Sequence, residues 1–291
     1  MKDINIFCFG FGQVAKNFIK KLSIEQYNIN LSATSRNKSS KKIFNGINYN
    51  SYLFNSENFD QNLVVKLKEA DHILVSIPPE NQEDLVIKNF SKFIESSKVK
   101  WITYLSATSI YGDHKGEWVN ENSKTNPISN NGIARLKAEN AWFSLEKSKK
   151  IPIQIFRLSG IYSNEKNILI RLKSGGVKLI NKKNHFFSRI HVDDISNILF
   201  KSLSKFKSGE IYNLSDDKPS TSEEVTLFGA KILNIENIEK IEVDQIKSEM
   251  LKNFYNESKK VSNKKMKSYF DYNLKFPSYI EGLNHISCNF I

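Results

Sequence analysis

The chain has 291 residues, a formal net charge of +12 and two cysteines. A chain of this length buries a large core unaided, and two cysteines cannot build a disulfide framework, so a disulfide-stapled secreted scaffold is excluded. No apolar run approaches the roughly 20 residues of a membrane span, and no signal-peptide pattern stands at the start. We therefore expect a cytoplasmic protein without a membrane partner.

The positive charge is spread along the chain in short clusters, as at 147–150, 182–183 and 259–260. No basic helix carries interleaved aromatic residues, so the charge favours a solvated surface over a nucleic-acid partner. A positive field can still attract a phosphate-bearing ligand. No group of histidines and cysteines has metal-ligand spacing, so no metal site is predicted.

The first predicted strand, Ile4 to Phe9, is followed at once by a Gly-x-Gly-x-x-Ala turn at residues 10–15. Apolar residues then recur at helical spacing up to residue 22. Strand, glycine turn and helix in this order indicate a dinucleotide site, where the helix N-terminus meets a pyrophosphate. The residues of this turn expected at the cofactor are Gly10, Phe11, Gly12, Gln13 and Val14.

The second predicted strand, residues 29–34, ends in Ser35 and Arg36. An acidic residue about here would bind the adenosine ribose hydroxyls of NAD. Arg36 can instead pair with the 2′-phosphate of NADP, and Ser35 lies beside it. The sequence therefore predicts NADP, with NAD as the alternative.

Strands and helices alternate through residue 156, which predicts an α/β fold with a Rossmann-like, doubly wound parallel sheet. The predicted helices cover 61–70, 85–94 and 131–147, and the predicted strands cover 72–77, 101–106 and 151–156; within 43–54 only a short strand near 47–49 is expected. Parallel strands end at one edge, so Ile77, Pro78 and Ser106 should also contact the cofactor.

Beyond residue 159 this alternation breaks. We expect residues 1–159 to form the dinucleotide-binding domain, with 186–214 returning to its sheet. Residues 160–185 and 215–291 would then form a smaller C-terminal substrate lobe.

Several segments resemble the extended short-chain dehydrogenases/reductases, the NAD-dependent epimerase/dehydratase family. They are Leu105 to Asp113, the helix around Asn131 to Glu139, Arg157 to Tyr162, and Arg189 to Asp194. The details are most similar to an atypical bacterial branch. The resemblance implies a cofactor site, a small-molecule substrate and, commonly, a homodimer.

Three positions depart from the family's catalytic pattern. The usual hydroxyl position falls on Ala107, the tyrosine on Asn131 and the lysine on Arg135. Asparagine carries no titratable proton, and arginine stays charged, although Arg135 can still bind cofactor oxygens. The sequence therefore predicts that cofactor binding is kept and that the usual proton transfer is lost. It predicts a branch of the family without the tyrosine–lysine pair.

Other side chains could transfer the proton instead, although each of them could equally have a purely structural role. The candidates are Ser106, Thr108, Tyr162 and His191. His191 precedes a predicted helix and could equally hold the strand–helix junction. Arg189 lies on the same strand face as Phe187, the position of the family's diphosphate-binding arginine, and could bind substrate in its place.

Two functions stay open on these residues. The first is an NADP-dependent oxidoreductase or epimerase/dehydratase-like enzyme acting on a small substrate, for which the family resemblance implies a sugar nucleotide. The second is a non-catalytic NADP-binding sensor or partner protein. The substituted positions 107, 131 and 135 favour the second, and the retained second lobe favours the first.

Overall fold

The computed structural model describes residues 2–288, which form two compact units. The first unit comprises the chain up to Ala107, together with Asn130–Arg157 and Ile195–Tyr212. The second comprises Thr108–Ser129, Leu158–Asp194 and the chain from Asn213 onward. The outermost residues of the expected domain ranges, 1 and 289–291, lie outside the described residues.

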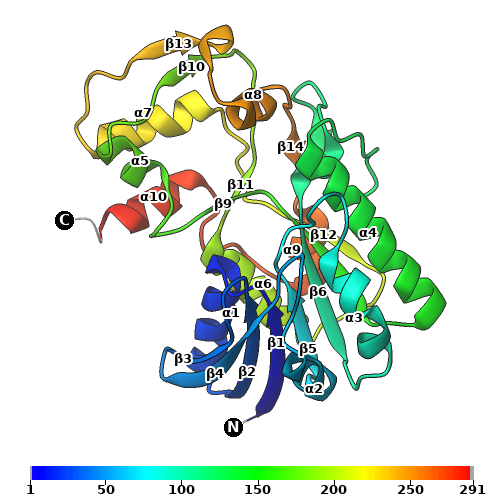
Figure 1. Ribbon diagram of the computed structural model, residues 1–291. Helices are drawn as coiled ribbons and strands as arrows, with labels where there is room; N and C mark the ends of the chain where they lie inside the picture. The colour runs from blue at the N-terminus through cyan, green and yellow to red at the C-terminus, as the bar shows by residue number, and fades with distance from the viewer. Residues whose placement is uncertain (1, 289–291) are drawn as a thin grey trace. The chain divides into compact units, whose positions relative to one another are not determined.

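The first unit is built on an eight-stranded sheet, in the order β12-β8-β6-β5-β1-β2-β4-β3 (Figure 1). Strand β1 pairs in parallel with β2 on one side and β5 on the other. The order reverses between these neighbours, and ligands of doubly wound sheets bind at that point. The sheet confirms the predicted fold class. Its strands are β1 (Asp3–Phe9), β2 (Asn28–Ser35), β3 (Ser40–Phe44), β4 (Ile47–Leu53), β5 (His72–Val75), β6 (Trp101–Ala107), β8 (Ile153–Leu158) and β12 (Ile211–Leu214).

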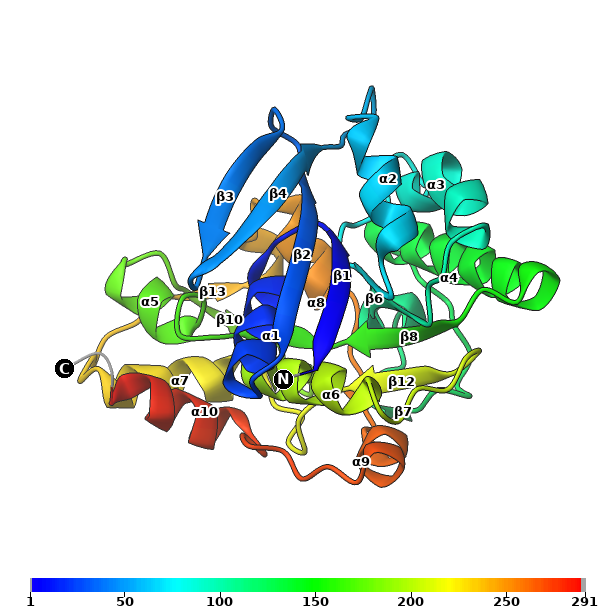
Figure 2. The same ribbon diagram turned by 90° about the horizontal axis from the view of Figure 1, so that it is seen from below.

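Helices α2 (Asn62–Glu69), α3 (Leu85–Glu95) and α4 (Asn130–Lys149) lie together on one side of this sheet (Figure 2). Alternate residues of β1, β5, β6 and β8 meet their apolar faces in one buried cluster. On α1 (Gln13–Ile24), Phe18 stacks on Trp101, whose indole donates to Ser202 of α6 (Val192–Ser202). Both faces of the sheet are therefore covered, which explains its near-continuous apolar strands.

One edge of the sheet is a hairpin that the sequence only partly predicted. Strands β3 and β4 pair antiparallel, with Phe44 opposite Ile47. Asn45 and Gly46 join them, with φ values of 50° and 75°. Asn-Gly is the preferred pair for such a turn, because both residues tolerate positive φ. Strand β3 is mostly exposed, so no buried apolar pattern marked it.

The second unit contains three small parallel pairs of strands and five helices among the described residues. Its apolar cluster includes Tyr162, Leu169 and Leu283. The pairs are β7 (Trp118–Val119) with β14 (Lys260–Val261), β9 (Gly160–Tyr162) with β11 (Arg189–His191), and β10 (Leu179–Asn181) with β13 (Lys240–Glu242). The helices are α5 (Ile168–Lys173), α7 (Ser222–Ile232), α8 (Glu249–Tyr255), α9 (Lys264–Phe270) and α10 (Tyr279–Ser287).

The segment 186–214, expected to return to the large sheet, is divided in the structure. Ile211–Leu214 joins the sheet as β12, whereas Arg189–His191 forms β11 and pairs with β9. Gly160 makes this pairing possible, because a side chain there would collide with the ring of Phe187. The glycine thus lets a short segment after β8 serve as the partner strand.

Candidate functional site

The predicted dinucleotide turn connects β1 to α1 and depends on two glycines in different ways. Gly10 has φ +84°, and a Cβ there would lie 2.8 Å from Ile77 Cγ2 and 2.9 Å from Ser76 Oγ. At Gly12, by contrast, a Cβ would meet no atom within 4 Å. Gly10 is therefore required by the fold, whereas Gly12 leaves open space above the start of the helix.

The N-terminus of α1 has the features of an anion site. Gly12 is its N-cap and supplies no side-chain partner, and no acidic residue occupies the first turn. The Nε2 atom of Gln13 is buried without a hydrogen-bond partner among the described residues. Unpaired N–H groups and a buried amide donor suit a phosphate.

Two other residues of the turn have structural contacts. The Phe11 ring packs on Phe44 and Tyr49, with ring centroids 5.2 and 4.9 Å apart. Val14 is buried on the inner face of α1. Any contact of these two with a cofactor stays a prediction.

Hydrogen bonds tie the turn to the neighbouring strands. The Gly10 N–H donates to Thr34 Oγ1 at 2.8 Å. The Ser76 hydroxyl is within hydrogen-bond distance of the carbonyl oxygens of Phe9 and Gly10. Ile77 is half-buried against Gly10, and Pro78 is exposed. The structure therefore brings Gly10 and Ile77 together at the predicted edge.

The end of β2 presents an exposed arginine. Ser35 Oγ donates to the Asn37 carbonyl oxygen at 3.2 Å. Arg36 is exposed and makes no hydrogen bond or ion pair within residues 2–288. Its guanidinium is available for a ligand anion, as the prediction of NADP requires.

Ser106 and Arg135 lie at the carboxyl end of β6. Ser106 is 2% exposed, and its Oγ has no hydrogen-bond partner in the described part of the chain. Arg135 Nη1 donates to the Leu105 carbonyl oxygen at 2.8 Å. Asn131, one helical turn earlier on α4, is exposed. The structure thus brings Arg135 to the strand end that carries Ser106.

Sequence reasoning missed a half-buried carboxylate at the start of α3. Asp84 accepts from the N–H groups of Val86 and Ile87 at the start of α3, and from Trp142 Nε1 at 3.0 Å. Burial raises the pKa of Asp84, and the charge of Arg135 opposes that rise. An aspartate directly before an apolar helix is the N-cap signal that could have found it.

A buried ion pair fixes α4 to β8 one turn beyond Arg135. Arg157 and Glu139 are 4% and 1% exposed, and Arg157 Nη2 lies 2.7 Å from Glu139 Oε2. Arg157 Nε also donates to both carboxylate oxygens. A multiple contact of this kind sets the position of the helix that carries Arg135.

The remaining proton-transfer candidates belong to the second unit. Thr108 begins a short 3-10 helix and is 7% exposed. Tyr162 donates its hydroxyl to the Ser278 carbonyl oxygen at 3.3 Å, and its ring packs directly against Gly282. Burial raises the pKa of Tyr162. These contacts are those of a packing residue.

His191 occupies the junction between β11 and α6. Its Nδ1 accepts from the Asp193 N–H at 3.2 Å, and its ring packs on Phe276 with centroids 4.2 Å apart. Burial lowers the pKa of His191 to about 4, so the ring is neutral at neutral pH. The geometry matches the structural alternative given for this residue.

Asp194 next to it anchors the C-terminal segment. It accepts from the Tyr272 hydroxyl at 2.7 Å and from the N–H groups of Lys275 and Phe276 at 2.6 and 3.1 Å. Asp194 is fully buried, so these bonds replace its hydration.

Arg189 on β11 lies beside an aspartate that the sequence did not single out. Its Nη1 donates to the carbonyl oxygens of Phe187 and Ser220, both at 3.1 Å. Asp216, after β12, is 2% exposed, and its N–H donates to the Arg189 carbonyl oxygen at 2.7 Å. No motif marked Asp216, because only the folded chain brings it to Arg189.

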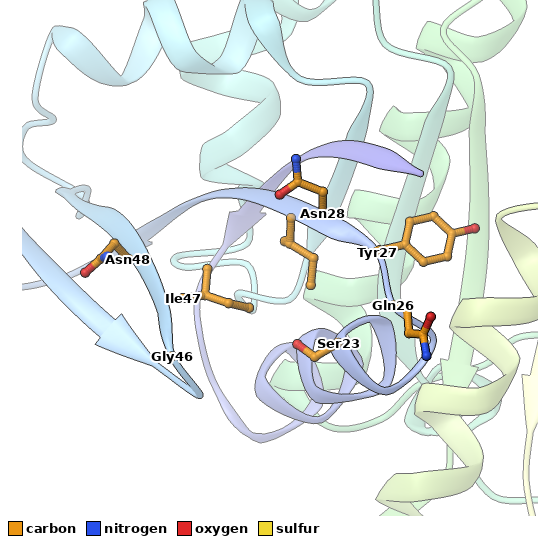
Figure 3. A pocket seen from close by; sticks show the side chains of 8 residues that line it. Ser23, Gln26, Tyr27, Asn28, Gly46, Ile47 and Asn48 are labelled. Carbon is orange, nitrogen blue, oxygen red and sulfur yellow. The ribbon is translucent and has the colours of Figure 1, made fainter. Parts of the chain in front are cut away.

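A surface pocket of about 480 Å³ lies elsewhere in the first unit. Figure 3 shows its lining side chains, which come from the end of α1, the start of β2 and the β3–β4 hairpin. Asn28 lines it, whereas Arg36 follows the opposite end of β2. This pocket is therefore separate from the predicted cofactor residues.

Residues 2–288 contain neither a cluster of metal ligands nor a membrane-spanning helix. No group of three or more His, Cys, Asp or Glu residues could hold a metal ion. Within the same residues, no helix is long and apolar enough to cross a membrane.

Comparison with known proteins gives a partial match to one family model and a shared fold. Residues 87–215 match the sequence model of the NAD dependent epimerase/dehydratase family, which confirms the resemblance read from the motifs. No curated protein sequence matches the chain.

Solved structures extend the likeness to the whole chain. A functionally unknown conserved protein from Silicibacter pomeroyi is 27% identical, with a TM-score of 0.86 and 99% of each chain covered. The NAD complex of dTDP-glucose 4,6-dehydratase from Bacillus anthracis is 20% identical, with a TM-score of 0.76 over 99% of this chain and 96% of that one.

A third structure is UDP-glucuronic acid 4-epimerase from Bacillus cereus, in complex with UDP-glucuronic acid and NAD. It is 15% identical, with a TM-score of 0.77, and both chains are fully covered, at 100%. At 15–20% identity, the two enzymes show the fold alone.

Proposed function

We propose that this chain, whose residues 87–215 match the model of the NAD dependent epimerase/dehydratase family, binds NADP. We propose further that it is an oxidoreductase or epimerase/dehydratase-like enzyme acting on a small, sugar-nucleotide substrate. The observation that carries the proposal is the turn between β1 and α1, where Gly12 leaves open space at a helix start with no acidic side chain.

The residues around this turn fit a nicotinamide dinucleotide. The N–H groups at the start of α1 and the buried, unpartnered Gln13 amide would hold the pyrophosphate. Arg135 would donate to cofactor oxygens at the end of β6, near the buried Ser106 hydroxyl. When bound, such a cofactor supplies hydride transfer, and the chain supplies binding and orientation.

The preference for NADP over NAD rests on Arg36. Its exposed guanidinium has no partner within residues 2–288, and no acidic residue stands at 35–38 to bind the ribose hydroxyls of NAD. An arginine can hold a 2′-phosphate through two parallel hydrogen bonds.

Replacing Arg36 tests this assignment. Arg36→Ala should weaken NADP binding by roughly tenfold or more, because a charge-assisted hydrogen bond contributes about 1.5–3 kcal/mol. NAD binding should be unchanged. Titration calorimetry with both nucleotides measures the two affinities, and Lys38→Ala is the matched control. Equal losses for NADP and NAD, or no loss for either, would contradict the assignment.

The substrate class is proposed from the neighbours and from Arg189. The Bacillus cereus epimerase was solved with UDP-glucuronic acid. In this chain Arg189 is anchored through Nη1 to two carbonyl oxygens, and its Nε and Nη2 make no hydrogen bond with the described residues. These remaining donors suit the diphosphate of a sugar nucleotide.

A second candidate function is a non-catalytic NADP-binding sensor or partner protein. Ala107, Asn131 and Arg135 favour it, because they replace the groups that move a proton in the resembling enzymes. Incubation with NADPH or NADP and a panel of nucleotide sugars separates the two candidates. Turnover supports the enzyme, and tight NADP binding without turnover supports the sensor.

A further inference from the structure

The N-terminal part of the first unit carries positive charge that no acidic side chain balances. Residues 4–56 contain six lysines and one arginine but a single acidic residue, Glu25. Glu25 is already paired with Lys21, at 2.6 Å. The other basic side chains of this stretch make no ion pair among the described residues. Their charge therefore acts on any anion that approaches this part of the molecule.

Three of these lysines lie where α1 meets the β3–β4 hairpin. The Nζ atoms of Lys16 and Lys20, on successive turns of α1, each lie 5.9 Å from the centroid of the Phe44 ring. Lys42 is opposite Tyr49 in the β3–β4 register, and Phe44, two residues further on, projects from the same face of the hairpin. All three lysines are exposed. We call the surface formed by these three lysines the basic face.

The basic face adjoins the glycine turn. Phe11, which lies between Gly10 and Gly12, packs its ring on Phe44 and Tyr49, with centroids 5.2 and 4.9 Å apart. The Phe44 ring therefore separates the two ammonium groups of α1 from the side chain of the turn. This spacing is comparable with the Debye length, which is about 8 Å at physiological salt. The positive field of the basic face thus reaches an anion that enters the turn.

Structural roles account for only part of the basic face. A lysine on an edge strand discourages pairing with another chain, and this suffices to explain Lys42 on β3. It does not explain Lys16 and Lys20, which belong to a helix. Lys16 also stands one turn from the N-terminus of α1, where the helix dipole disfavours a cation. Helix stability therefore does not account for it, whereas an anionic ligand at the turn does.

We propose that the basic face attracts the dinucleotide electrostatically and favours NADP over NAD during association. A 2′-phosphate adds roughly −1.5 to −2 to the charge of the dinucleotide at pH 7, so NADP responds to the field more strongly than NAD. The three lysines act on the approaching ligand, whereas Arg36 and the start of α1 hold the bound one. This inference rests on the proposed function, because it assumes that NADP enters at the glycine turn.

Stopped-flow binding of NADP and NAD to the full chain tests the inference. In the triple variant Lys16→Gln/Lys20→Gln/Lys42→Gln, the association rate constant for NADP should fall roughly tenfold at about 10 mM salt, and less than about threefold at about 150 mM salt. The rate constant for NAD should fall by only about threefold at the lower salt. The dissociation rate constants should change by less than about twofold, because charges at the rim of a site act mainly on association.

The triple variant Lys68→Gln/Lys92→Gln/Lys147→Gln is the matched control. It removes the same amount of charge from exposed lysines of α2, α3 and α4, on the side of the sheet that these helices cover (Figure 2). Lys68 also lies over an aromatic ring, 5.6 Å from the centroid of Phe93. The association rate constants of this variant should equal those of the wild type.

Three outcomes overturn the inference and leave the proposed NADP site standing. They are equal association rate constants for NADP in the wild type and the basic-face variant, equal losses in the two triple variants, and equal losses for NADP and NAD. Association of NADP with the wild type that does not depend on salt also overturns it, even if the basic-face variant does not fold. No NADP binding by the wild type overturns the inference together with the proposed function.

Discussion

At the scale of single residues, the glycine turn separates a requirement of the fold from a requirement of the ligand. Gly10 adopts φ +84° with Ile77 and Ser76 against it, so any side chain there is strained and crowded. Gly12 has an ordinary φ of −86° and open space where a Cβ would project. The same motif therefore contains one glycine for folding and one that leaves room for a ligand.

This difference predicts opposite outcomes for two alanine variants. Gly10→Ala should lower the free energy of unfolding by about 1–3 kcal/mol, since positive φ and a close contact both oppose it. Gly12→Ala should lower it by less than about 1 kcal/mol but weaken NADP binding, because the new methyl occupies the approach to the helix N-terminus. Urea unfolding and nucleotide titration of both variants measure this. A Gly12→Ala protein with wild-type affinity would show that the open space is not used.

At the scale of elements, Asp194 links the start of α6 to the segment before α10. Its three hydrogen bonds come from Tyr272, Lys275 and Phe276, all far along the chain. The carboxylate of the adjacent Asp193 makes a 2.8 Å ion pair with Lys275, whose side chain is 49% exposed. We therefore expect Asp194 to contribute more to the stability of the fold than its neighbour Asp193.

We expect Asp194→Ala to cost about 3 kcal/mol of unfolding free energy, because it leaves several donors unpaired in a buried place. Asp193→Ala should cost less than about 1 kcal/mol, as exposed ion pairs usually do. Equilibrium unfolding in urea at neutral pH gives both values. Equal costs for the two variants would rule out the anchoring role of Asp194.

At the scale of the whole molecule, buried titratable groups couple stability to pH. Burial lowers the pKa of both His72 and His191 to about 4. In the unfolded chain these rings titrate near their ordinary value of 6.5. The unfolded state thus binds more protons, so their contribution is complete above about pH 6.5 and is lost as the pH falls toward 4. Asp84, Asp194 and Asp216, whose pKa values are raised, act in the opposite direction.

His191→Phe isolates one of these contributions. The wild type should lose about 2 kcal/mol through His191 between pH 7 and about pH 5, by the linkage between pKa and stability. The variant keeps an aromatic ring against Tyr162 and Phe276 and should lose correspondingly less over the same range. Urea midpoints at the two pH values measure the difference. An identical acid loss in both proteins would show that His191 is not the responsible group.

The sequence by itself determined the α/β fold class and the glycine turn, and it indicated the resemblance to the epimerase/dehydratase family. Each depends on apolar strands, helical spacing and glycines at fixed positions. These are local patterns that can be recognised in the sequence without knowing the tertiary structure. The sequence also predicts three substituted catalytic positions, by counting within a motif. The turn of the β3–β4 hairpin could have been predicted from Asn45-Gly46. Strand β3 could not, because it has no buried face and so no alternating apolar pattern.

The tertiary structure alone decided how distant residues combine. It paired β11 with β9, joined Asp84 to Trp142, and set Asp216 beside Arg189. It also placed Tyr162 and His191 in packing and junction contacts. Burial and charge at these places arise from segments far apart in sequence, and no local periodicity encodes which segments meet.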